Sequence, residues 1–226
     1  TEFLKGTWAQ YFLMCVVIFT IVYGCSMAVK ETHIKRRLAY STISNLSYIL
    51  FGVLIMTPLG LVGALCHMVF HGVMKICSFF CAGAMITQAH ANYVYEIDGM
   101  AKKMPKVFGI FTVSAFALMG VPGLCGFISK WNLAQAAFTS ENILAVVGVG
   151  ALLVSALLTA IYMLAIVIRA YFHERVSDSE RMEHEVKDPD WRMILPLGLF
   201  AAAMFVLGVY SSPFVEFFTK VANGLL

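Results

Sequence analysis

Long apolar runs separated by short polar links dominate the chain. Five runs are uninterrupted, and a sixth is interrupted by Pro122-Gly123. Each uninterrupted run is long enough to cross the hydrocarbon core, which needs about 20 apolar residues. Because backbone polar groups in lipid must be satisfied within their own segment, the runs predict helices. The expected spans are 8–29, 38–57, 60–86, 107–139, 143–172 and 193–211, with a polar loop over 173–191.

The interruption within 107–139 predicts a broken helix. Pro122 removes a backbone donor and clashes with the preceding turn, and nearby glycines loosen the same stretch. Neither half, 107–121 or 124–139, reaches the usual span length. Such breaks persist in a bilayer only where they are buried in protein or line a wet cavity. We therefore expect one broken crossing within a single transmembrane domain over 1–226.

The distribution of basic residues favours a single crossing for this segment. The links 30–37, 87–106 and 173–191 carry Lys and Arg, whereas the turns near 58–60 and 140–142 have neither. One crossing places all three basic links on the same side of the membrane, as the positive-inside rule requires. The prediction is an all-α transmembrane bundle of about six spans, with both termini on the opposite side.

Composition agrees with a membrane protein. Hydrophobic residues make up 60% of the 226 residues and charged residues 13%, whereas soluble domains have about 45–50% and about 25%. The mean hydropathy is +0.82, and the net charge of +3 gives no indication of nucleic-acid binding. The cysteines lie in or near apolar runs without metal-ligand spacing, so we interpret them as small apolar residues. We expect an integral, polytopic protein in contact with the lipid bilayer of a bacterial or archaeal cytoplasmic membrane.

Three titratable residues in the third span form the first candidate site. His67, His71 and Lys75 are four residues apart and project from one stripe of a helix. Each step rises about 6 Å, so one or two waters can bridge neighbouring side chains. Charge inside a membrane costs at least ~2.5–3.5 kcal/mol, which makes a proton wire a reasonable interpretation. Two histidines satisfied by neighbouring helices and a lysine reaching toward the interface explain the pattern equally well.

Lys130 is the second candidate, because it follows the predicted break. A broken helix frees carbonyls and amides that hold water or ions, so a lysine there is well placed to titrate. The alternative is that Lys130 and Trp131 anchor the chain at a membrane surface. Ser41, Thr42 and Ser44, near the start of the second span, either cap it or face a polar interior together with Asn45 and Ser47. No nucleophile, phosphate-binding, dinucleotide, zinc, haem or iron–sulfur motif is present, so we expect no cofactor, metal or redox site.

Three motifs in this order resemble one family. They are the basic link and following helix at 35–44, the His67-x-x-x-His71-x-x-x-Lys75 run, and the glycine-rich segment 122–130 that ends at Lys130. Together they resemble the antiporter-like subunits of respiratory complex I, of membrane-bound hydrogenases and of Mrp-type cation/proton antiporters. The resemblance spans nearly the whole chain.

The resemblance implies a fold, roles and partners. The chain would correspond to the second of two inverted five-helix repeats, plus one helix. Lys75 would be a relay residue on a central polar axis, Lys130 the terminal titrating residue, and His67 and His71 water-bridged relays. The transported ions would be protons, with sodium as a candidate exchanged ion. Other membrane subunits would be partners, and the redox enzyme, an NADH:quinone oxidoreductase or a hydrogenase, would be one of them.

The chain departs from the family in two motifs and in its extent. The basic link reads Thr-His-Ile-Lys at 32–35 where Asp-Ile-Lys is usual, and the break has Pro122-Gly123 where two prolines are common. The first repeat, with its buried glutamate and partner lysine, is missing. We therefore expect a fragment or split gene product that transports protons within a larger assembly.

Two other functions fit parts of the pattern. A structural membrane anchor without transport explains the missing repeat. A membrane enzyme that uses His67 and His71 as metal ligands fits the spacing of those residues, although no third ligand lies within that span.

Overall fold

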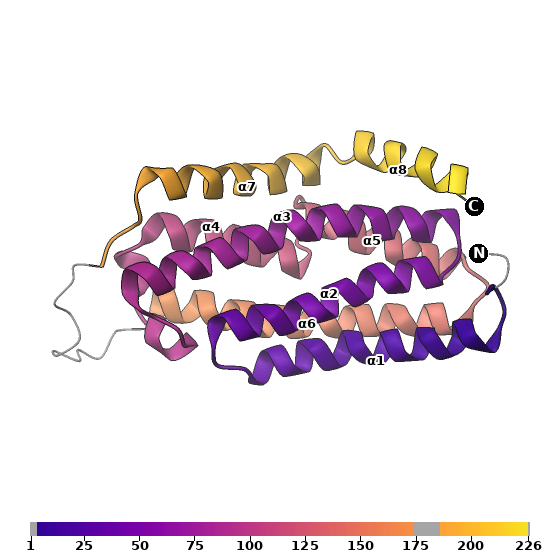
Figure 1. Ribbon diagram of the computed structural model, residues 1–226, viewed down its shortest axis with the longest axis horizontal. Coiled ribbons are helices and arrows are strands. Elements are labelled where there is room, and N and C mark those ends of the chain that lie inside the picture. The colour runs from indigo at the N-terminus through magenta and orange to yellow at the C-terminus, as the bar shows by residue number, and fades with distance from the viewer. Residues whose placement is uncertain (1–3, 174–185, 226) are drawn as a thin grey trace.

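The computed structural model describes residues 4–173 and 186–225 as an elongated bundle of helices (Figure 1). Within these ranges the only extended pairing is an isolated antiparallel bridge between His33 and Tyr93. The predicted all-helical fold is therefore confirmed. The elements are α1 Trp8–Lys30, α2 Ile34–Leu54, α3 Pro58–Ala89, η1 Val94–Ile97, η2 Met100–Lys102, α4 Pro105–Met119, α5 Cys125–Thr139, α6 Ile143–Phe172, α7 Trp191–Val209 and α8 Ser212–Leu225.

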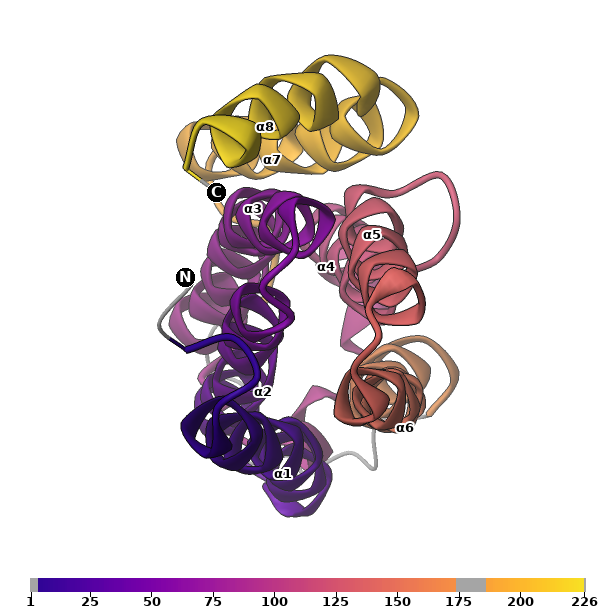
Figure 2. The same cartoon turned by 90° about the vertical axis from the view of Figure 1, so that its right-hand side faces the viewer.

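Helix α3 is the longest helix and the centre of the packing. It contacts α2 and α5 on one side and α4, α7 and α8 on others. Helices α1, α2 and α6 pack together next to it, and Figure 2 shows α7 and α8 as a separate outer layer beside α3. The interior that matters for function is enclosed by α1, α2, α3, α5 and α6.

The first two basic links and the described ends of the third meet at one end of the bundle. The amide of Ile34 donates to the carbonyl of Asn92 over 2.9 Å, which joins the first link to the second. The amide of Gly99 donates to the carbonyl of Arg169 over 3.1 Å, which joins the second link to the end of α6. Asp188, just before α7, accepts hydrogen bonds from the first turn of α4. Both chain ends lie at the opposite end of the bundle (Figure 1).

Four of the described helices, α1, α3, α6 and α7, are long and apolar enough to cross a membrane. Helix α2 falls outside this set although it has 21 residues, because its first turn is basic and its inner face is polar. Helices α4 and α5 have 15 residues each and fall outside it by length. The number of crossings remains a prediction that depends on α4 and α5 acting as one broken span.

The break between α4 and α5 has the expected form. Helix α4 ends at Gly120, whose φ of 92° lies in the left-handed region that glycine tolerates best. Helix α5 begins five residues later at Cys125. A Cβ on Gly126 would lie 1.9 Å from the carbonyl oxygen of Ala117, so the two halves approach as closely as only glycine permits.

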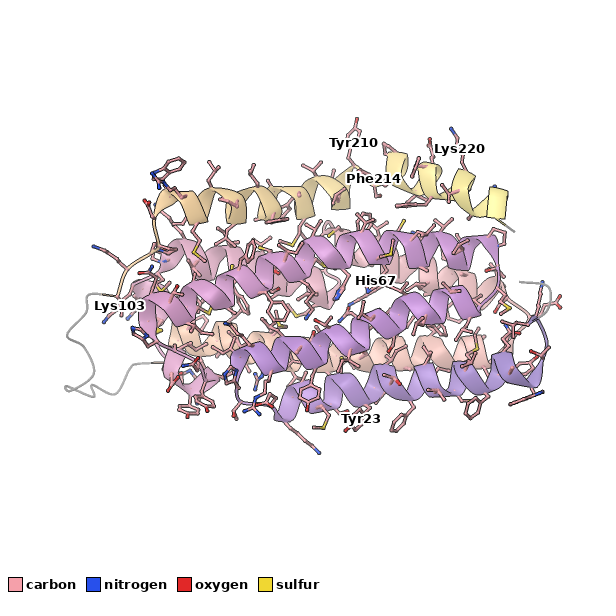
Figure 3. All side chains as sticks on the ribbon, in the orientation of Figure 1. Tyr23, His67, Lys103, Tyr210, Phe214 and Lys220 are labelled. Carbon is pink, nitrogen blue, oxygen red and sulfur yellow. The ribbon has the colours of Figure 1, made fainter. Side chains whose placement is uncertain are left out.

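Helix α8 was not predicted, because we expected the last helix to end at 211. The apolar run stops there, and α8 is amphipathic and too short to be recognised by its apolar length. Its apolar side packs on α3, where the rings of Phe214 and Phe70 are 6.5 Å apart. Figure 3 shows Phe214 directed toward the bundle and Lys220 away from it.

Candidate functional site

The predicted stripe of α3 points into the bundle. His67, His71 and Lys75 have exposed fractions of 0%, 4% and 6%, and Figure 3 shows His67 in the interior between α2 and α3. The two imidazoles stack with their centroids 5.6 Å apart. This geometry rules out a direct hydrogen bond between the stacked rings and leaves transfer between them to a bridging molecule. Lys75 is therefore directed into the bundle and does not reach toward the membrane interface, as the alternative interpretation had it.

Lys75 is held by α2. Its Nζ donates to Ser41 Oγ over 2.7 Å and to the carbonyl oxygen of Leu38 over 3.1 Å. Both acceptors are neutral. Because α2 begins at Ile34, Ser41 lies in its interior and not at its N-cap. The capping alternative for this serine was therefore wrong, and the polar-interior alternative is confirmed.

Lys130 is held by the helix break. Its Nζ donates to the carbonyl oxygens of Leu118 and Met119 over 2.6 and 3.0 Å. These carbonyls belong to the last turn of α4, where the helix leaves its carbonyls without intrahelical partners and its dipole favours a cation. The ammonium group thus points inward to the break. Trp131 points outward with 55% exposure, so an anchoring role suits Trp131 and does not suit Lys130.

Tyr48 of α2 lies between the two lysine sites and was not predicted. Its ring is 5.1 Å from the ring of His67, and Lys130 Nζ lies over its face, 5.7 Å from the centroid. This is the geometry of a cation–π contact. On the other side, His67 Nδ1 is 2.9 Å from Ser129 Oγ, next to Lys130 in sequence. His67, Tyr48 and Lys130 therefore belong to one site.

Several buried nitrogens of the site have no protein partner. Among the described residues, both ring nitrogens of His71 and Nε2 of His67 contact no hydrogen-bonding group. The side-chain oxygen of Asn45 likewise has no hydrogen-bond partner. Buried polar groups are nearly always hydrogen-bonded, and water is the usual partner where protein does not supply one. The imidazoles are therefore suited to bind water.

Acidic residues are absent from the helices that build the site. None of the α-helices from α1 to α7 contains Asp or Glu; Glu96 is in the short 3-10 helix η1, and Glu216 is in α8. In the part of the chain that the structure describes, no three His, Cys, Asp or Glu side chains form a group able to hold a metal ion. Within the described residues, therefore, no third side chain of these types joins His67 and His71 in a group that could hold a metal ion.

A buried arginine joins the basic end to the interior. Arg37 Nε donates to the carbonyl of Glu31 over 2.7 Å, and Nη1 donates to the carbonyl of Tyr162 over 3.1 Å. At the surface, the amide of His33 donates to the carboxylate of Glu31, and Arg36 lies nearby. The backbone amide, with help from the arginine, holds the pKa of Glu31 below its usual 4.5. Sequence reasoning had placed Arg37 in a surface link.

Residues 2–159 match the family described as NADH:quinone oxidoreductase/Mrp antiporter, TM. The chain belongs to this family. The matched stretch contains His67, His71, Lys75 and Lys130, so the whole candidate site lies within it.

Curated relatives and a solved structure agree with this antiporter-like assignment. NADH-quinone oxidoreductase subunit N of Desulforudis audaxviator is 32% identical over 204 residues, covering 87% of this chain and 40% of the relative. NAD(P)H-quinone oxidoreductase chain 4 1 of Synechococcus sp. is 34% identical over 155 residues, covering 67% and 30%. The chain thus spans less than half the length of these relatives.

The structure of the Mrp complex from Dietzia sp. contains a chain with the same fold. The TM-score is 0.87 at 21% identity, and the match covers 96% of this chain and 47% of the solved one. At that identity the likeness shows the fold alone. The matched transmembrane family and the four long apolar helices show that this antiporter-like chain is an integral membrane protein, and the likeness to the Mrp chain shows its helical fold.

Proposed function

We propose that this antiporter-like chain carries protons through part of a membrane, with Lys75 and Lys130 as the groups that take up and release them. The observation that carries the proposal is that Lys75 is buried and Lys130 half-buried among α-helices without acidic residues, and that both are bonded only to neutral oxygens. A structural lysine is usually paired with a carboxylate when it is buried. A lysine without that partner can lose its proton without leaving an unpaired negative charge.

The histidines supply a route between the two lysines. A neutral imidazole both donates and accepts a hydrogen bond, and the free nitrogens of His71 and His67 are available to water. His71 lies one helical turn from Lys75, and His67 contacts Ser129 and Tyr48 beside Lys130. A proton can therefore pass from Lys75 through water and the two imidazoles to the break.

Protons fit this site better than sodium ions. A sodium ion prefers several oxygen ligands, and here the neutral oxygens already hold two lysine side chains. Each ammonium also repels a second cation in a medium of low dielectric. Sodium exchange, if it occurs in the assembly, belongs to another part of it.

We also propose that the chain works within a larger assembly of membrane subunits. The relatives are more than twice as long, and the helices described here hold two cationic groups without a compensating acid. The remaining protein would supply acidic groups and the driving reaction, which is electron transfer in complexes that contain an NADH-quinone oxidoreductase.

The test is proton uptake by inside-out membrane vesicles that contain the assembled complex. Lys75→Ala and Lys130→Ala should each abolish uptake while the complex still forms, as judged by its migration on a native gel. Lys102→Ala, at an exposed position of η2, is the matched control and should leave uptake unchanged. Normal uptake in both Lys75→Ala and Lys130→Ala would show instead that the chain is a structural anchor.

A further inference from the structure

A cluster of hydroxyl groups and one thiol fills the space between α1, α2 and α6. On α2 the hydroxyl residues recur at helical spacing, and on α6 they do the same, so two polar stripes face each other. Every member is at most 1% exposed. The hydroxyl cluster consists of Cys25, Ser41, Ser44, Tyr48, Ser155, Thr159 and Tyr162.

One arm of the hydroxyl cluster begins at Lys75. The lysine Nζ donates to Ser41 Oγ over 2.7 Å, and Ser41 Oγ is 2.5 Å from the hydroxyl of Tyr162. Tyr162 in turn donates to Thr159 Oγ1 over 3.2 Å. Three hydrogen bonds therefore lead from the first lysine to the middle of α6.

The other arm ends beneath Lys130. Cys25 Sγ lies 3.6 Å from Thr159 Oγ1 and 2.9 Å from Ser155 Oγ, so the thiol connects these two hydroxyls. Tyr48 donates to Ser155 Oγ over 2.7 Å. The ring of the same tyrosine carries Lys130 on its face and His67 at its side. The contacts are continuous from Lys75 to the hydroxyl of Tyr48.

The direction of the hydrogen bonds fits two charged lysines. Tyr162 donates to Thr159 and Tyr48 donates to Ser155, so both tyrosines direct their protons toward the centre of the hydroxyl cluster. Lys75 consequently donates to Ser41 Oγ, which accepts. Lys130 lies over the negative face of the Tyr48 ring. In this arrangement the cluster stabilises both ammonium groups without a carboxylate.

We propose that the hydroxyl cluster is a second proton path between the two lysine sites, made of side chains and parallel to the water-filled histidine route. This inference rests on the proposed function. When Lys75 gives a proton to Ser41, the serine passes its own proton to Tyr162, and the same exchange continues through Thr159, Cys25 and Ser155. At rest Thr159 donates to a carbonyl, Cys25 donates to Ser44 and Tyr48 donates to Ser155, so these groups must turn before each can pass its proton on. Once Ser155 donates to Tyr48, the tyrosine releases its own proton, and water carries it to the neighbouring His67. Each oxygen or sulfur holds one proton before and after, and no electron moves.

Cys25 is the residue on which continuity depends. Apart from the thiol, Thr159 Oγ1 donates only to the backbone carbonyl of Ser155, over 2.7 Å. A carbonyl has no proton to pass on, so the path would stop there. The thiol is the side chain that contacts the hydroxyls of both Thr159 and Ser155. A serine at this position keeps a donor and an acceptor of similar reach, whereas an alanine keeps neither.

The experiment compares paired variants in vesicles containing the assembled complex. Cys25→Ala and Thr159→Val remove links of the path, whereas Cys25→Ser and Thr159→Ser retain them. All four variants are measured in a chain that also carries His71→Ala, which interrupts the parallel histidine route. We expect the first pair to lower proton uptake per assembled complex at least about tenfold relative to His71→Ala alone, which corresponds to roughly 1.4 kcal/mol of activation free energy. The second pair should transport close to the rate of His71→Ala alone. Ser26→Ala is the control, because Ser26 Oγ donates to the carbonyl of Val22 in its own helix.

Lys75→Ala, measured in the same experiment, separates the two proposals. If it abolishes uptake while Cys25→Ala and Thr159→Val transport as well as His71→Ala alone, or if His71→Ala alone abolishes uptake, the side-chain path is wrong and proton carriage by the lysines stands. Equal losses in the alanine, valine and serine variants would also overturn the path, because packing alone would then explain the effect. Normal uptake in Lys75→Ala would overturn the proposed function itself.

Discussion

Lys75 and Lys130 are both directed into a bundle whose enclosing helices contain no acidic residue, yet different groups hold them. Lys75 is on an uninterrupted helix, and a serine side chain and a carbonyl of the neighbouring α2 accept its hydrogen bonds. Lys130 follows a broken helix and bonds to two backbone carbonyls that the break has freed. The first site is made by side-chain chemistry and the second by backbone geometry.

This difference shows two ways of keeping a lysine inside a membrane without a carboxylate. A hydroxyl group can also donate when the lysine loses its proton, so the Lys75 site can adapt to both forms. A backbone carbonyl can only accept a hydrogen bond, so the Lys130 site favours the charged form of its lysine. The Lys75 site is therefore sensitive to single side-chain substitutions in α2, whereas the Lys130 site is sensitive to the shape of the break.

The largest effect should come from Gly126→Ala, which alters the break. The added Cβ would lie 1.9 Å from the carbonyl oxygen of Ala117, so the two halves of the broken helix must move apart. We expect a loss of about 3 kcal/mol or more in the free energy of unfolding, at the upper end for overpacking. Thermal unfolding in detergent and the amount of protein in the membrane measure this change.

Gly109→Ala is the matched control in α4, because nothing lies within 4 Å of its added Cβ. A helical alanine there should be neutral or stabilise the chain by about 0.5–1 kcal/mol. Equal stability of the two variants would contradict the close approach of α4 and α5.

A smaller effect is expected for Ser41→Ala, which alters the Lys75 site alone. The lysine loses its side-chain acceptor and keeps the carbonyl of Leu38. Leaving a buried charged donor partly unsatisfied costs about 1–3 kcal/mol, which thermal unfolding detects. Ser47→Ala should change stability little, because Ser47 Oγ bonds to a carbonyl of its own helix. If the two substitutions were equally mild, Ser41 would not be what holds Lys75.

The smallest effect concerns Glu31, which is remote from both lysines. Its folded-state pKa lies below 4.5, mainly because of the His33 amide. The stabilisation is therefore present above pH 4.5 and is lost as the pH falls through the folded-state pKa. It should be less than about 1 kcal/mol, as for other solvent-screened interactions. Glu31→Gln should unfold at a slightly lower temperature than wild type at pH 7, and the difference should disappear near pH 3. A difference that persists there would contradict an ionic origin.

The sequence allowed the fold class, the helix break and four candidate residues to be predicted. The apolar runs are long, and Pro122 with its neighbouring glycines is a strong local signal. Helix α8 was missed because its apolar residues occupy one face only. The start of α2 was placed four residues too late, because Lys35 and the two arginines after it indicated a loop.

The contacts of the site could not be predicted in the same way. Tyr48 and Tyr162 are spaced on their own helices like ordinary core residues, and only the packing of α1, α2 and α6 brings their hydroxyls into one cluster. The spacing of hydroxyl residues along α2 was a usable signal, since Ser41, Ser44 and Tyr48 share a face. For Lys130, the identity of the accepting carbonyls depends on how far α4 continues before Gly120.

Replacing Lys75 and Lys130 with arginine tests the central claim most directly. Arginine keeps the positive charge and hydrogen-bond donors but does not lose its proton at physiological pH. In vesicles containing the assembled complex, Lys75→Arg and Lys130→Arg should leave assembly intact and abolish proton uptake. Wild-type uptake by both arginine variants would show that the charge of these residues matters and that their deprotonation does not, which would contradict a role as proton carriers.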